Sequence, residues 1–127
     1  MVKEISSKEE FDNIISESGD KLVVVDFTAA WCGPCKMIAP EFKRFSETYT
    51  EVIFLKVDVD KCRDIASAQK VSAMPTFKFF KNGTVYDVFS GASVAKLEQF
   101  IQKYSAAEAE PNPDAGQSSG GGGCILS

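Results

Sequence analysis

Cys32 and Cys35 stand at the junction of two different hydrophobic patterns, and this junction constrains the fold more than any other feature of the sequence. The preceding residues 22–27 are too few for a helix and are apolar on both alternating faces, as in a central strand covered on both sides. Beyond the pair, apolar side chains recur at spacings of three and four from Cys35 to Tyr49. We therefore predict a buried strand, then the cysteine motif, then a long helix that begins there.

The remaining patterns alternate between helix and strand. Ser7 followed three residues later by Glu10 predicts a capping box at a helix start. Asn82-Gly83 between two apolar runs predicts a tight hairpin, because a type I′ turn needs positive φ at both central positions. The further predicted elements are an edge strand at residues 2–5, a helix at 7–18, a strand at 52–57, a short helix at 62–66, strands at 76–80 and 84–89, and a helix after Gly91.

This order of elements predicts one fold class. Strands joined through helices are expected to be parallel, and the two strands of the hairpin antiparallel. The predicted class is therefore α/β, with a mixed central β-sheet flanked by helices on both faces. A chain of 127 residues suffices for one compact domain and is too short to divide comfortably into two.

The composition of the chain changes at about Ser105. All 14 Lys and Arg precede this point, and after it no large aliphatic side chain returns until Ile125. We predict a folded domain at residues 1–105, a flexible Gly/Ser/Pro-rich linker at 106–123, and a prenylation motif at 124–127.

Several classes of protein are disfavoured by the same composition. No stretch approaches the ~18 apolar residues that are needed to cross a bilayer. The N-terminus lacks an apolar segment behind a positive start, so residence in the cytosol rather than secretion is expected. No basic patch indicates binding of nucleic acid.

The position of the cysteine pair has a chemical consequence. Cys32 is expected beside the free N–H groups of the long helix, which together with the helix dipole stabilise a thiolate. The thiolate is the nucleophile of disulfide exchange, so Cys32 is predicted to attack first and Cys35, one turn into the helix, to resolve the mixed disulfide. Pro34 suits a first helical turn. Gly33 is expected to let the backbone turn and to leave room for a substrate chain.

Other uses of the cysteines fit the sequence less well. A structural zinc site needs four ligands, but the chain has no His and its other cysteines, Cys62 and Cys124, are isolated, so no metal is expected. A disulfide framework does not suit a reducing compartment, and C-x-x-C between strand and helix favours redox use over an incidental pair. Cys62 shares a helix face with Ile65 and Ala66 and is expected to be a small buried thiol.

Asp26 interrupts the first apolar strand. We expect a desolvated carboxyl with a raised pKa, placed to relay a proton to or from Cys35. Lys56, on the neighbouring predicted strand, is its expected electrostatic partner. The alternative is an aspartate at a strand end that bonds local loop amides.

Four segments carry a family resemblance: Trp31-Cys32-Gly33-Pro34-Cys35-Lys36, Val25-Asp26-Phe27, Met74-Pro75-Thr76-Phe77 and Asn82-Gly83. Over residues 1 to about 105 the chain resembles the thioredoxin family, and its animal cytosolic members in particular. The resemblance implies the thioredoxin fold and a general protein-disulfide reductase. The catalytic residues that it implies are Cys32, Cys35 and Asp26, and the substrate-binding residues are Trp31, Gly33, Pro34, Met74, Pro75 and Gly91.

The resemblance also carries expectations about geometry and partners. In the family the proline that matches Pro75 is cis and exposes the backbone of the preceding residue, here Met74, to an extended substrate. A trans proline at a strand start stays open, since most X-Pro bonds are trans. No bound cofactor is implied, and electrons come from NADPH through thioredoxin reductase. The implied substrates are disulfide-containing proteins such as peroxiredoxins, ribonucleotide reductase and methionine sulfoxide reductases.

Two other functions compete with reduction of protein disulfides. A redox-indifferent binding module could use the same fold, but the intact cysteine pair, Asp26 and Pro75 argue against it. An oxidase or isomerase of a secretory compartment conflicts with the missing signal peptide. It also conflicts with Gly33-Pro34, where more oxidising relatives carry a His.

The last four residues, 124–127, fit a C-a-a-X motif whose terminal Ser127 favours farnesyl on Cys124. A chance match and an engineered thiol after a Gly linker are the alternatives. One lipid without a polybasic segment binds membranes only reversibly. The expected location is therefore cytoplasmic, with weak, partial membrane association on the cytosolic side through farnesyl.

Overall fold

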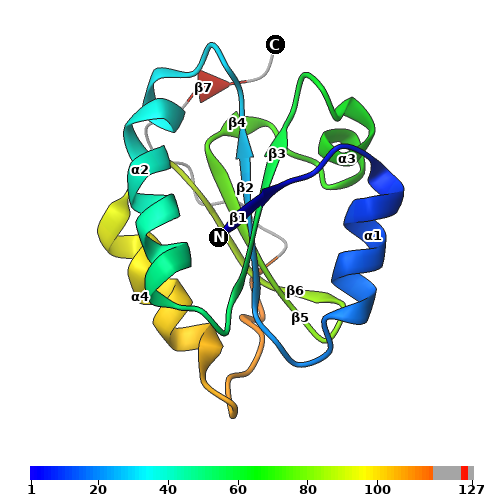
Figure 1. Cartoon of the computed structure of the whole chain (residues 1–127), viewed down its shortest axis with the longest axis vertical. Helices are drawn as coiled ribbons and strands as arrows, with labels where there is room; N and C mark the ends of the chain where they lie inside the picture. Colours follow the sequence, from blue (N-terminus) through cyan, green and yellow to red (C-terminus); the bar gives the residue numbers. More distant parts are fainter. Residues whose placement is uncertain (116–123, 126–127) are drawn as a thin grey trace.

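The computed structural model describes residues 1–115 and 124–125 of the chain (Figure 1). Its elements, in order, are β1 (Val2–Glu4), α1 (Lys8–Glu17), β2 (Val23–Thr28), α2 (Gly33–Thr48), β3 (Ile53–Asp58), α3 (Arg63–Ala68), β4 (Ala73–Met74), β5 (Thr76–Lys81), β6 (Thr84–Ser90), α4 (Val94–Ser105) and β7 (Cys124–Ile125). Every helix and strand predicted from the sequence is present, with similar bounds. The two-residue strands β4 and β7 are additional to the predicted elements.

Within the described part of the chain, five strands form the central sheet in the order β1-β3-β2-β5-β6. β1 and β2 both pair with β3 in parallel, whereas β5 pairs antiparallel with β2 and with β6. α1 and α3 cover one face of the sheet, and α2 and α4 cover the other (Figure 1). The predicted mixed sheet with helices on both faces is confirmed, and it places the end of central strand β2 just before the start of α2.

The direction of β5 differs from the expectation. β3 and β5 are joined through α3, yet β3 runs parallel to β2 and β5 runs antiparallel to it. The expectation that helix-joined strands are parallel is therefore wrong for this connection. The six residues of α3 span about 9 Å, whereas the six residues of β3 extend about 20 Å. The helix is too short to return the chain to the start of β3, so β5 begins near the end where β3 finishes.

β2 is buried along its whole length, as predicted for a central strand. Val23 and Val25 belong to the cluster that includes side chains of α1 and α3, and Val24 belongs to the cluster formed with α2 and α4. Successive side chains of a strand point to opposite faces. Asp26 therefore lies on the same face as Val24, toward α2.

Of two short sequence signals, the hairpin turn forms as predicted and the capping box forms in part. Ser7 is the N-cap of α1, and its Oγ accepts a hydrogen bond of 3.1 Å from the Glu10 N–H. The Glu10 carboxylate accepts from the backbone N–H of Ser6 at 2.9 Å, one residue earlier than a capping box requires. At the hairpin, Asn82 and Gly83 both have positive φ, of 55° and 77°, as a type I′ turn demands.

The chain after α4 returns along edge strand β6. The Asn112 N–H donates to the Tyr86 carbonyl at 2.8 Å, and Asn112 Nδ2 donates to Asp87 Oδ1 at 3.1 Å. Residues 116–123 of the predicted linker, and 126–127 of the predicted prenylation motif, lie outside the described residues. The boundaries of domain, linker and motif therefore stay a prediction. None of the helices in the described ranges combines the length and the apolar character needed to span a bilayer.

Candidate active site

Cys32 is the N-cap residue of α2. Its backbone is extended, with φ −93° and ψ 112°, and its Sγ accepts a hydrogen bond of 3.2 Å from the Cys35 N–H. Pro34 lies in the first turn of the helix, where its missing N–H costs nothing. Cys32 and Cys35 form a disulfide with their Cα atoms 5.3 Å apart. The predicted placement of Cys32 beside the free N–H groups of a helix is thus found in the structure.

The two glycines predicted at the site have different environments. Gly33 begins α2, and its φ lies outside the positive range, so the turn that was expected to need glycine does not need it. A Cβ at Gly33 would meet no atom within 4 Å, which leaves the expected room above the motif. Gly91 has φ +110°, a conformation that favours glycine, and its N–H donates to the Pro75 carbonyl at 2.9 Å.

Trp31 is the exposed member of the motif. Its side chain is 52% exposed, whereas Cys32 has no exposed surface and Cys35 is 2% exposed. Trp31 Nε1 donates a hydrogen bond of 2.8 Å to Asp60 Oδ2, which fixes the indole beside the cysteine pair. Sequence reasoning missed Asp60, because it is 29 positions away and lies in no pattern that points to Trp31.

The loop before β5 lies against the cysteine pair. The Met74-Pro75 peptide bond is cis, which settles the alternative left open by the sequence. Cys32 Sγ is 3.7 Å from the Met74 carbonyl oxygen, and Met74 itself is fully buried. The structure therefore brings together Cys32, Met74 and Pro75, which are more than 40 positions apart in the sequence.

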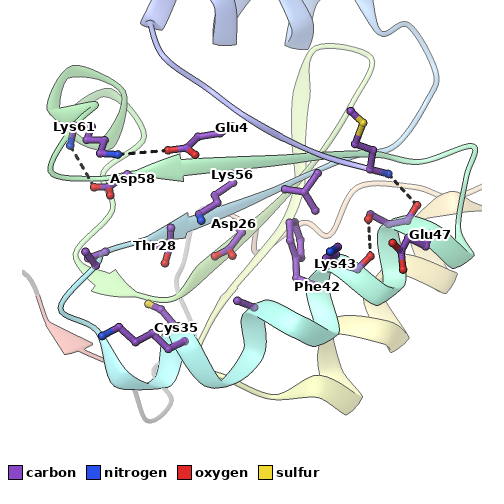
Figure 2. A pocket seen from close by; sticks show the side chains of 17 residues that line it. Glu4, Asp26, Thr28, Cys35, Phe42, Lys43, Glu47, Lys56, Asp58 and Lys61 are labelled. Carbon is purple, nitrogen blue, oxygen red and sulfur yellow. Dashed lines mark hydrogen bonds and ion pairs between the residues drawn. The ribbon is translucent and has the colours of Figure 1, made fainter.

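A cavity of about 730 Å³ lies between the sheet and α2 and reaches both Asp26 and Cys35 (Figure 2). Asp26 and Lys56 are paired across β2 and β3, and both line this cavity. The volume is enough for several water molecules, each of which occupies about 30 Å³ in the liquid. The Asp26 carboxyl and the Cys35 sulfur thus face one cavity that is large enough to hold water.

Asp26 is only 3% exposed, and its Oδ1 accepts no hydrogen bond from the described residues. Burial raises the pKa of the carboxyl from 3.8 to about 7, and the charge of Lys56 opposes this rise. The position and the raised pKa agree with the expected desolvated carboxyl. They do not agree with the alternative of an aspartate bonded to loop amides.

Cys62 is buried at the start of α3. Its Sγ lies 3.5 Å from the carbonyl oxygen of Ile5. Burial raises the pKa of this thiol, which makes it a weaker nucleophile at neutral pH. The expected small buried thiol is thus found. Across residues 1–115 and 124–125, no group of three His, Cys, Asp or Glu side chains could hold a metal ion.

Comparison with known proteins gives one consistent result. The family model for thioredoxin matches residues 2–103. The human thioredoxin is 57% identical over 103 residues, which cover 81% of this chain and 98% of that protein, and the thioredoxin of Callithrix jacchus is 56% identical over 104 residues, which cover 82% and 99%.

Solved structures agree with the sequence comparison. The thioredoxin of Plasmodium falciparum has a TM-score of 0.77 and 48% identity, and the match covers 80% of this chain and 98% of that one. A structure from work on the thiol-resolving mechanism of yeast mitochondrial 1-Cys peroxiredoxin via glutathione/thioredoxin systems has a TM-score of 0.75 and 38% identity, with coverage of 80% and 93%.

Proposed function

Since the chain belongs to the thioredoxin family and is a thioredoxin-type protein-disulfide reductase, we propose that its active pair divides the work, with Cys32 as the attacking thiol and Cys35 as the resolving thiol. The observation that carries this division is the N-cap geometry. Cys32 Sγ accepts the N–H of Cys35 at the start of α2, and N–H groups and helix dipole there stabilise a thiolate.

The cycle begins with the reduced pair. The Cys32 thiolate attacks one sulfur of the substrate disulfide, and the other substrate sulfur leaves as a thiolate. Cys35 then attacks Cys32 Sγ, which releases the second substrate thiol and forms the Cys32–Cys35 disulfide seen in the structure. Two electrons pass from the cysteine pair to the substrate.

Asp26 is proposed to accept the proton of Cys35 during resolution. A general base works best when its pKa lies near the operating pH, and burial brings the pKa of Asp26 to about 7. Because Asp26 and Cys35 line one cavity, the transfer runs through water rather than by direct contact. Lys56, paired with Asp26 across the strands, stabilises the carboxylate that results.

The proposed substrate groove surrounds the cysteine pair. It is formed by Trp31, Gly33, Pro34, Met74, Pro75 and Gly91. The exposed indole of Trp31 and the open space over Gly33 support a surface that accepts a protein chain. The hydrogen bond from the Gly91 N–H to the Pro75 carbonyl supports a fixed position of Pro75 beside the pair.

The electrons are proposed to come from NADPH through thioredoxin reductase, with no cofactor bound by the chain itself. Peroxiredoxins, ribonucleotide reductase and methionine sulfoxide reductases are the proposed substrates. The similar structure from work on yeast mitochondrial 1-Cys peroxiredoxin supports peroxiredoxins as substrates.

This proposal is tested with the full chain, NADPH, a purified thioredoxin reductase and insulin as the model protein disulfide. We expect NADPH consumption in proportion to the insulin disulfides reduced, and none when the chain is omitted. Consumption that does not depend on the chain would refute the proposed electron source.

Cys124 is proposed to carry a farnesyl group in cells that contain the transferase, with the chain cytoplasmic and in part weakly membrane-associated. The support is the C-a-a-X pattern at 124–127. The intact mass of the chain made in a eukaryotic cell is expected to show a farnesyl adduct with loss of the last three residues. The unmodified mass from a cell that prenylates a control protein would contradict this expectation.

A further inference from the structure

The described C-terminal residues lie at the active-site end of the molecule. β7 pairs antiparallel with β4, with Cys124 opposite Met74 and Ile125 opposite Ala73. Figure 1 shows β7 at the same end of the fold as β4 and the start of α2. The carbonyl of Met74 is 3.7 Å from Cys32 Sγ, so the backbone of Cys124 is paired with the residue that touches the predicted nucleophile.

We propose that β7 is a built-in ligand of the active site, and that Cys124 is a third exchange thiol that reacts with the Cys32–Cys35 disulfide. The inference rests on the proposed function of this pair. It concerns the chain with a free Cys124, because a thioether at that sulfur removes its nucleophilicity.

The placement of residues 112–115 supports the docking of β7. Asn112 is held to β6 by its backbone bond to Tyr86 and by its side-chain bond to the buried carboxylate of Asp87. Three residues later, Ala115 lines a cavity together with Thr76 and Ser90. Thr76 follows Pro75 directly, so Ala115, the last residue of the first described range, lies near the strand that follows β4.

The burial of the active pair bears on access to the site. Cys32 and Met74 have no exposed surface in the structure that includes β7. A substrate disulfide must reach Cys32 to be reduced. A substrate chain that pairs with the Met74 edge must also displace β7, because one strand edge accepts one partner.

The proposed exchange is balanced in atoms and electrons. The Cys124 thiol loses its proton, and the thiolate attacks Cys32 Sγ. The Cys32–Cys124 bond forms as the Cys32–Cys35 bond breaks. Cys35 leaves as a thiolate and takes up a proton, so no oxidant or reductant is consumed.

The experiment uses a two-thiol chain, Cys35→Ser/Cys62→Ser, in which Cys32 and Cys124 are the remaining cysteines. It is made in bacteria and treated with one equivalent of 5,5′-dithiobis(2-nitrobenzoic acid). We expect release of both thionitrobenzoate groups, and a Cys32–Cys124 linked peptide in a monomer by mass spectrometry. Linkage between two chains, or release of one group only, would overturn the proposal.

A matched control separates docking from mere tethering. In the two-thiol background, Cys124→Ser/Gly122→Cys moves the thiol two positions along the same tail. Ile125→Pro keeps Cys124 but removes a backbone N–H and constrains the strand. We expect the second release step to be at least tenfold slower in both variants than in the two-thiol chain. Equal rates in the three chains would show that the tether alone brings the thiols together.

A turnover measurement tests the competition. In the otherwise unchanged chain, Ile125→Pro is expected to lower KM for insulin at least threefold and to leave kcat unchanged, because a larger fraction of sites is open. An unchanged KM would overturn the occlusion. If neither the unchanged chain nor Ile125→Pro reduces insulin, the proposed function fails. If the unchanged chain reduces insulin but the two-thiol chain forms no Cys32–Cys124 bond, only the present inference fails.

Discussion

Replacing Cys32 with serine is expected to lower kcat/KM for insulin reduction by at least about a thousandfold. The serine hydroxyl is not ionised at neutral pH, so the variant has no nucleophile to form the mixed disulfide. The fold should survive, because serine is close to cysteine in size and α2 retains a good N-cap residue. Activity is followed by NADPH oxidation, and circular dichroism checks the fold.

Two variants sharpen this test. Cys62→Ser is the matched control, because Cys62 lies in the core at the start of α3. The activity of this variant should stay within about twofold of that of the original chain. Cys35→Ser/Cys124→Ser keeps the attacking thiol but lacks both thiols that are proposed to attack Cys32, so it should accumulate a mixed disulfide with the substrate. Full turnover by Cys32→Ser would refute the assignment of Cys32 as the nucleophile.

Replacing Asp26 with asparagine is expected to stabilise the oxidised chain at pH 8 by up to ~4 kcal/mol. The pKa of Asp26 is raised to about 7 in the folded chain, against an ordinary value of 3.8. One pKa unit corresponds to about 1.36 kcal/mol, which gives the upper bound. Asparagine resembles the protonated carboxyl and does not ionise, so the cost of a buried charge disappears.

The pH dependence gives this prediction its sign. Between about pH 4 and pH 7 the unfolded chain has released the Asp26 proton while the folded chain still holds it, so this group makes stability fall as pH rises. Above pH 7 both states are ionised and the loss is complete. The advantage of Asp26→Asn should therefore be absent near pH 4, grow up to pH 7, and stay constant above it.

The measurement is urea unfolding of both chains from pH 4 to pH 9. Asp20→Asn changes an exposed carboxyl and serves as the control, with an expected effect within about 0.5 kcal/mol at every pH. A constant difference between Asp26→Asn and the original chain across the range would contradict the raised pKa. Asp26→Asn should also slow resolution of the mixed disulfide and remove an inflection near pH 7 from its rate, which a purely structural role would not do.

The parts of the site that were predictable from the sequence are those that a local pattern determines. The change from a buried strand to a helical spacing places Cys32 at a helix start, and the interruption of that strand makes Asp26 a buried carboxyl. Each of these two predictions uses only residues that are close together in the sequence. The structure accordingly has Cys32 as the N-cap of α2 and Asp26 almost fully buried.

The parts that were missed depend on lengths and on distant contacts. The direction of β5 follows from the short span of α3, which hydrophobic periodicity does not report. The bond between Trp31 and Asp60 links two loops that no repeat connects. β7 has only two residues, too few for any alternation to appear, and its pairing with β4 depends on the tertiary structure around Met74.

The half-exposed indole of Trp31 makes the site its own optical reporter. The chain has a single tryptophan, and it directly precedes Cys32. Tryptophan fluorescence therefore originates entirely beside the active disulfide, with the ring fixed by its bond to Asp60. Changes in emission are expected to accompany reduction of the disulfide, and they can be followed without any added label.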